Sequence, residues 1–205
     1  MEHVPHSPYL RALGGQRAQL HPALRTYFSA VPSGQVGVGE GTFSRIGTPR
    51  RWLWPVLRWL QKHGVVYAGW HENVPFTVRN VSVASRVIGE RTLHLPDEDW
   101  TMRDSAGSTA HGRVLDQLGE PVTVAVVFDV TVDGDALALR SRSVGIRLGR
   151  FRLLVPRPLA PIVRLCESAE RQAGRQRVAL TIDVPLLGRV YEYEGVFTYR
   201  LEDVS

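Results

Sequence analysis

Strict alternation of apolar and polar residues runs through much of the second half of the chain. In "PVTVAVVFDVTVDGDALALRSRSV", which starts at Pro121, valines and one phenylalanine occupy every second position from Val122 to Val132. A period of two is typical of a strand with one buried face. Asp133-Gly134 is a typical tight-turn sequence. The pattern therefore predicts a β-hairpin whose apolar face lies on the core.

The C-terminal segment "RVYEYEGVFTYRL" alternates in the same way and predicts the last strand of the sheet. Its aromatic face is expected to point inward, either as plain core or as the lining of a ligand cavity. Glu192 and Glu194 stand roughly 7 Å apart on the other face. That spacing would allow them to act as paired carboxylates across a bond. Their face also carries Thr198 and Arg200, which favours the interpretation of a solvated surface.

Two further stretches break a simple pattern. In "VPFTVRNVSVASRVI" the apolar positions change parity near Asn80, which predicts a β-bulge. In "GQVGVGEGTF" the glycines at 37, 39 and 41 are two apart, so in a strand they share one face. That face would be flat, and a helix or a ligand could approach it closely. The alternative, a phosphate-binding loop, lacks the strand before it and the lysine after it.

Three segments have helical spacing. The first lies within residues 1–30. The second, 49–63, is rich in tryptophan, with Thr48 as N-cap, Gly64 after its end and Pro55 expected to kink or split it. The third, 159–172, would turn its apolar residues inward and end at Gly174; those residues are Ile162, Val163, Cys166 and Ala169.

Because hairpin-type connections dominate, we predict an α+β fold built on an antiparallel sheet. The sheet is expected to be strongly curved, as a half or near-closed barrel, with helices on its concave side. A length of 205 residues fits a single domain. Residues 1–30 would form its helical segment and residues 35–205 the curved sheet with its two helices.

Composition narrows the functional classes. With 43% hydrophobic and 22% charged residues, the chain has the balance of a globular protein. The net charge is +5, but the basic residues are scattered, so nucleic acid is not an expected partner. Neither a signal-peptide pattern nor a membrane-spanning stretch is evident, and we expect a cytoplasmic protein. Cys166 is the single cysteine, which excludes an intrachain disulfide.

Candidate site residues come from aromatic clusters and from one acid–base pair. His71 and Glu72 follow Trp70 and could exchange protons; with Tyr193 they are the predicted catalytic residues. The histidine spacing fits no zinc pattern, and no motif indicates another cofactor, so neither is expected. A pairing of His111 with the neighbouring serines lacks a nucleophile elbow. The predicted ligand-binding residues are Trp52, Trp59, Trp70, Trp100, Arg103 and Tyr191.

Several motifs, spread over nearly the whole chain, resemble the bacterial domain-of-unknown-function 4166 (DUF4166) family. They are "SPYLRALG", "VGEGTF", "VPFTV", "DGDALALRS", "RPLAP" and "VPLLGRVYEYEG". The last, from Pro185 to Gly188 with Tyr193 and Gly195, is the most specific. "WTMRDSAGS" departs from the Trp-x-Arg-x-Phe-Gly-Gly run usual in the family. The resemblance implies that such a domain stands alone or follows a reductase-like domain; it implies no activity.

A curved sheet with a tryptophan-rich helix predicts a mostly apolar pocket with a few polar groups. The leading hypothesis is a protein that binds a hydrophobic small molecule, and in enzymatic form a cofactor-independent cyclase or isomerase of bacterial secondary metabolism. The alternative is a non-enzymatic carrier of lipids or apolar ligands, or an accessory module at the membrane surface. In either case the oligomeric state is open.

Overall fold

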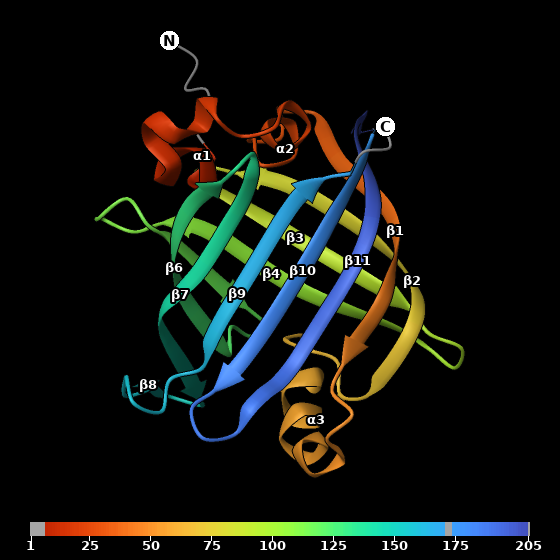
Figure 1. The fold of residues 1–205 in the computed structure, drawn as a ribbon, viewed down its shortest axis with the longest axis vertical. Coiled ribbons are helices and arrows are strands. Elements are labelled where there is room, and N and C mark those ends of the chain that lie inside the picture. The colour runs from red at the N-terminus through yellow and green to blue at the C-terminus, as the bar shows by residue number, and fades with distance from the viewer. Residues whose placement is uncertain (1–6, 171–173, 205) are drawn as a thin grey trace.

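The computed structural model describes residues 7–170 and 174–204 (Figure 1). Its helices are α1 (Pro8–Leu13), α2 (Pro22–Tyr27) and α3 (Trp54–Lys62), with 3₁₀ turns at Gly14–Ala18 and Arg51–Leu53. The strands are β1 (Gln35–Gly47), β2 (Trp70–Val83), β3 (Arg86–His94), β4 (Asp99–Ser108), β5 (Val114–Leu118), β6 (Val124–Asp133), β7 (Ala136–Leu148), β8 (Phe151–Leu154), β9 (Ile162–Ala169), β10 (Arg175–Val184) and β11 (Gly188–Asp203).

Ten of these strands close into an antiparallel barrel. From β1 to β7 each strand pairs with the next one in the chain, β7 then pairs with β9, and β11 returns to β1. β8 pairs only with β7 among the described strands, so it extends beside the barrel wall. The predicted antiparallel sheet is confirmed, and its curvature goes further than expected because the barrel is closed.

The helices lie at the ends of the barrel (Figure 1). α1 and α2 cover one end, called here the α1–α2 end, and α3 lies at the opposite end, called the α3 end. The Tyr27 ring of α2 contacts the rings of Phe197 and Tyr199 on β11, with centroids 5.4 Å and 4.7 Å away. The prediction of helices along the concave face is therefore not confirmed.

The barrel interior follows the predicted alternation. Tyr191, Tyr193 and Phe197 of β11 are buried at 3%, 5% and 3% exposure. On β1 the glycines leave room for these aromatic side chains: a Cβ at Gly37 would lie 1.6 Å from the Tyr199 hydroxyl. The close approach predicted for the glycine face is thus made by aromatic residues of the neighbouring strand.

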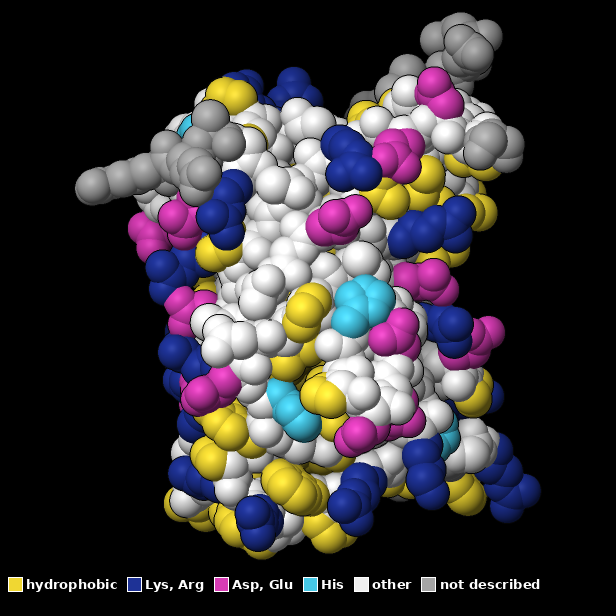
Figure 2. All heavy atoms as spheres, turned by 90° about the vertical axis from the view of Figure 1, so that its right-hand side faces the viewer, with side chains coloured by type: hydrophobic (Ala, Val, Ile, Leu, Met, Phe, Trp, Pro, Cys, Tyr) yellow, Lys and Arg dark blue, Asp and Glu magenta, His cyan; other side chains and the backbone are white. Residues whose placement is uncertain are grey.

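The outer wall is charged and mixed in sign. On the face shown in Figure 2, basic and acidic side chains interleave over the strands, whereas the lowest band carries basic and hydrophobic side chains. The interleaving agrees with the absence of a basic stripe in the sequence.

The predicted helix at 159–172 is wrong. Residues Ile162–Ala169 form β9, which pairs with β7 on one side and with β10 on the other; residues 171–173 lie outside the described part. Two neighbouring strands supply all the backbone partners that a helix would have made internally. The period of two then turns Cys166 outward and Glu167 inward, where a helix would have buried the cysteine.

The tryptophan-rich segment is helical, and Pro55 splits it as expected into the 3₁₀ turn at Arg51–Leu53 and α3. Gly64, with φ of 71°, follows the end of α3. Thr48 is not the N-cap, because Arg50 takes that position, and the Thr48 hydroxyl accepts a bond from the Arg50 N–H at 3.3 Å. Leu57 faces the barrel and is buried.

Candidate functional site

Four charged residues on four different strands point into the barrel. Arg91 on β3, Asp104 on β4, Asp116 on β5 and Glu167 on β9 share the inward parity of their apolar neighbours. We call them the interior cluster. Arg91 Nη1 lies 3.4 Å from Asp104 Oδ1, which makes these two an ion pair. Three carboxyl groups therefore face a single guanidinium inside the barrel.

The two other carboxyl groups are incompletely bonded. Asp116 Oδ1 and Glu167 Oε2 are inaccessible and have no hydrogen-bond partner among the described residues. Glu167 as a whole is only 1% exposed. A buried polar atom without a partner is destabilising, and such atoms are uncommon in folded proteins. The interior cluster therefore has unused hydrogen-bonding capacity.

Burial sets the protonation of this cluster. It raises the pKa of Glu167 to about 8, although the nearby Arg91 opposes the rise. Burial, together with the charge of Asp104, raises the pKa of Asp116 to about 8 as well. Both groups are therefore mostly protonated near neutral pH. The charges of Arg91 and Asp104 then cancel, and the cluster has almost no net charge.

Arg91 lies at the centre of the interior. Although burial alone lowers the pKa of its guanidinium, Tyr27, Tyr193 and Asp104 raise that pKa well above its usual value. Burial also raises the pKa of Tyr193 to about 12, so its hydroxyl stays protonated and can donate a hydrogen bond. The cluster thus offers one fixed cation and several neutral donors.

A small cavity lies beside Arg91 inside the barrel. Its volume is about 10 Å³, which is close to the space that one water molecule needs. The side chain of Arg91 keeps 19% of its surface accessible despite its central position. We call this space the inner chamber; it is lined by Phe43, Ile46, Arg91, Leu93, Trp100, Met102, Tyr191 and Tyr193.

A larger cleft opens to solvent near the end of α3. Its volume is about 370 Å³, within the range of small-molecule sites. We call it the outer cleft; its lining consists of Gln61, Lys62, His63, Gly64, Glu98, Trp100, Thr101, Arg103 and Glu120. Trp100 belongs to both linings. Its indole N–H donates to the Gln61 carbonyl at 3.1 Å, which links the ring to α3.

Four of the site residues predicted from the sequence line the inner chamber, the outer cleft or both. Tyr191 and Tyr193 line the inner chamber, Arg103 lines the outer cleft, and Trp100 lines both. Arg103 is held on the rim by Glu90, with Nε 3.0 Å from Oε1, and by Glu120, with Nη1 3.3 Å from Oε2.

The other five predicted residues line neither space. His71 lies at the rim of the barrel, where its Nε2 is 3.3 Å from the Tyr67 hydroxyl. Glu72 is exposed on the outer wall, and Trp70 beside it is half-buried. Trp52 and Trp59 are exposed by 59% and 36% near and on α3. The structure does not bring His71 and Glu72 together with Tyr193.

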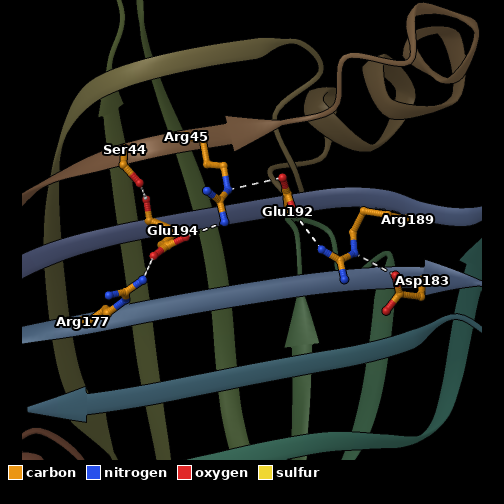
Figure 3. A network of polar contacts seen from close by, with 7 residues as sticks. All are labelled: Ser44, Arg45, Arg177, Asp183, Arg189, Glu192 and Glu194. Atoms are coloured by element: carbon orange, nitrogen blue, oxygen red, sulfur yellow. Dashed lines mark hydrogen bonds and ion pairs between the residues drawn. The ribbon is translucent and has the colours of Figure 1, made fainter.

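Glu192 and Glu194 lie outside the barrel in a network of ion pairs (Figure 3). Arg45 reaches both carboxylates, at 3.3 Å from Glu192 and 2.5 Å from Glu194. Arg177 pairs with Glu194, and Arg189 bridges Glu192 and Asp183 at 2.7 Å to each. Every carboxylate in Figure 3 has a basic partner, which supports the solvated interpretation of this face.

The interior cluster was missed, although the sequence carries a signal for most of it. Asp116 stands two positions from Val114 and Leu118, and Asp104 two from Met102 and Ala106. A carboxylate on the apolar parity of a strand is the signal. For Glu167 the signal is not recognisable, because the spacing of residues 159–172 predicts a helix and not a strand.

A comparison with protein families gives one match. Residues 20–197 match the model for the domain of unknown function DUF4166. The chain belongs to the DUF4166 family. The match covers α2 and the whole barrel up to the inward-facing part of β11, so the fold described here belongs to the family domain. Neither the curated proteins nor the solved structures contain a significant match to this chain.

Two further observations on this DUF4166 domain complete the description. Within residues 7–170 and 174–204, no three His, Cys, Asp or Glu side chains are grouped so that they could hold a metal ion. In the same residues no helix has the length and apolar character required to cross a membrane.

Proposed function

We propose that this DUF4166 domain binds a small, largely apolar molecule inside the barrel. The molecule enters from the outer cleft, passes Trp100 and places a polar group against Arg91. One observation carries the proposal: Trp100 lines both an open cleft of about 370 Å³ and an interior space that is also lined by the partly accessible Arg91. Pockets with apolar walls and few convergent polar groups are typical ligand sites.

The inner chamber in its present form is too small for such a molecule, so binding requires side chains to move. Met102 is unbranched and adapts easily to a new shape. Arg91 and Trp100 are also only partly buried. Movement of these three side chains would join the two spaces, while the rigid Phe43–Phe76 stack, with ring centroids 3.9 Å apart, remains as the far wall.

The interior cluster favours a ligand with an uncharged oxygen. The guanidinium of Arg91 is already balanced by Asp104, and Glu167 and Asp116 are mostly protonated near pH 7. A ligand carboxylate would bring an unbalanced negative charge into the barrel, which is costly. A hydroxyl or carbonyl group would instead bond the partnerless oxygens of Glu167 and Asp116.

In its enzymatic form the site is a cofactor-independent isomerase or cyclase of bacterial secondary metabolism. Glu167 donates its proton to a double bond or carbonyl oxygen of the substrate, and its carboxylate then takes a proton from a neighbouring carbon. Loss of that proton moves the double bond; in a cyclase, a second double bond of the substrate first attacks the cation formed by protonation, which makes the ring bond, and the same loss of a proton then gives the neutral product. A pKa of about 8 suits a general acid near neutral pH. A carrier would use the same space without this step.

The test uses all-trans-retinol, a fluorescent polyene alcohol, and retinoic acid, which has the same polyene and a carboxylate. We expect the protein to bind retinol more tightly than retinoic acid at pH 7. Trp100→Leu should raise the Kd for retinol by about tenfold, because a central aromatic contact with the ligand is lost. Trp54→Leu is the matched control, because Trp54 is also half-buried and donates its indole N–H to a backbone carbonyl at 3.1 Å.

Equal effects of the two variants, or none from either, would contradict an interior site.

The enzymatic form has its own test: linear polyene and polyketide precursors are incubated with the protein and analysed by mass spectrometry. Precursors that bind but return unchanged identify a carrier. If turnover is found, Glu167→Gln should abolish it while retinol binding persists.

A further inference from the structure

The α3 end of the barrel exposes an unusual number of large apolar side chains. Three segments lie at this end: residues 47–64 with α3, residues 149–161 with β8, and the turn 185–187 between β10 and β11 (Figure 1). Their exposed apolar residues and exposed fractions are Leu186 100%, Leu154 71%, Val56 63%, Leu159 60%, Trp52 59%, Phe151 59%, Leu153 53%, Leu187 44% and Trp59 36%. We call this surface the apolar end.

The turn 185–187, at the tip of this surface, projects into solvent. Leu186 has a φ of 68°, which a leucine rarely adopts, and its side chain is fully exposed. The turn is held to the segment before α3, because the Arg50 guanidinium donates to the Leu187 carbonyl. A strained, anchored turn that presents a leucine to solvent gives no packing benefit to the barrel itself.

The charges within two of the segments at this end have one sign, whereas the acidic residues Glu98 and Glu120 lie at the outer cleft beside Lys62. Residues 47–64 and 145–161 contain eight Arg and Lys residues and no Asp or Glu; they are Arg50, Arg51, Arg58, Lys62, Arg147, Arg150, Arg152 and Arg157. No ion pair involves any of these eight within the described part of the chain. The barrel wall differs, because its arginines pair with carboxylates, as in Figure 3. The lowest band of Figure 2 accordingly combines basic and hydrophobic side chains.

Apolar side chains at loop tips, tryptophans and unpaired arginines together match a membrane surface. Tryptophan and arginine side chains favour the interface between headgroups and acyl chains. Basic residues near a bilayer are attracted by anionic headgroups. A protein partner would also cover apolar residues, but it would have to provide acidic groups opposite both basic segments, whereas an anionic bilayer provides them everywhere.

We propose that the apolar end docks onto an anionic lipid bilayer. Leu186, Leu187 and the β8 side chains reach the acyl chains, and the surrounding arginines bind the headgroups. The outer cleft opens beside α3 at this same end, so a ligand drawn from the bilayer has a short path to Trp100. The docking surface stands on its own observations and does not depend on ligand binding inside the barrel.

The experiment measures co-sedimentation of the full chain with vesicles of phosphatidylcholine alone or with phosphatidylglycerol. We expect binding only to vesicles that contain phosphatidylglycerol, and weaker binding at high salt. Leu186→Asn should weaken it about tenfold or more, since an inserted leucine is lost. This variant should still fold, because asparagine tolerates a positive φ better than leucine. Arg150→Gln with Arg152→Gln should weaken binding roughly 25-fold, at about a fivefold loss for each charge.

Matched controls lie elsewhere on the barrel. Val83→Asn removes an apolar residue that is 55% exposed at the α1–α2 end, and Arg25→Gln with Arg79→Gln removes two exposed basic residues away from α3. Both should bind like the unmodified protein. Equal losses in the controls, absence of binding to the anionic vesicles, or equal binding to neutral vesicles would overturn the proposal. So would light scattering that shows a dimer in the unmodified protein and a monomer in Leu186→Asn, because a second copy would then cover this end.

Discussion

Two sets of carboxyl groups on one barrel wall differ in almost every property. Glu192 and Glu194 face outward from β11, and each has arginine partners. Glu167 faces inward from β9, where one of its oxygens has no partner, and burial raises its pKa to about 8. On the outer wall the pKa of Asp129 is instead lowered, chiefly by its hydrogen bond to Arg113. The direction in which a carboxyl group points from its strand, and not the type of residue, therefore determines its partners and its pKa.

The outward and inward carboxyl groups also differ in their effect on the stability of the fold. Exposed ion pairs contribute little to stability because water already solvates both partners. Buried and partly unpaired groups destabilise the fold, so their presence needs another explanation. Inside this barrel they share the interior with Arg91, whose charge acts on the pKa of both Asp116 and Glu167.

The largest effect is expected from Arg91→Met. Methionine fills much of the same volume, but it leaves Asp104 without its partner at 3.4 Å. Breaking a buried pair on one side costs about 3 kcal/mol. The free energy of unfolding, measured with urea, should fall by that amount. Arg45→Met on the outer wall is the control, with an expected loss below about 1 kcal/mol. Similar losses in the two variants would mean that the interior is as well solvated as the surface.

A pH dependence of intermediate size should come from Glu167. Its pKa is about 8 in the folded protein and has an ordinary value of 4.5, so the folded state binds more protons between these two values. The free energy of unfolding therefore falls as the pH rises from about 4.5 to about 8. The contribution of a single group can reach roughly 1.4 kcal/mol per pH unit.

Urea unfolding at several pH values measures this slope. Glu167→Gln should reduce the slope and leave a part that belongs to Asp116, whose pKa is also raised to about 8. Glu192→Gln on the outer wall should leave the slope unchanged. A Glu167→Gln variant with the full slope would show that this carboxyl group is ionised in the folded protein.

Much of the fold could be predicted from the sequence because the barrel wall is built from alternation. The hairpin from Val122, the inward tyrosines of β11 and the division of the tryptophan-rich segment at Pro55 all follow from local patterns. Closure could not be predicted, because it depends on β7 pairing with β9 and on β1 pairing with β11, and local periodicity does not specify such partners.

The errors share a physical cause, which is polar residues on the inward face. Asn80 was interpreted as a bulge, yet the register runs evenly through it, with Arg79 opposite Glu90 and Asn80 opposite Gly89. Its side chain simply continues the interior face as a buried polar residue. Glu167 broke the alternation of β9 in the same way and made a helix the better match. The residues that obscured the pattern are therefore the ones that define the candidate site.

The smallest effect is expected from Glu194→Gln, which removes the charge that Arg45 and Arg177 share on the outer wall. Both arginines are about half-exposed, at 45% and 51%, so water can replace the lost partner. Stability should fall by less than about 1 kcal/mol, and the loss should shrink further in high salt because the pair is screened. Retinol binding should not change, since the carboxylate faces away from the inner chamber. A loss as large as that of Arg91→Met would instead mean that the ion-pair network of Figure 3 holds the barrel closed, and the contrast between the two faces would then concern charge state alone.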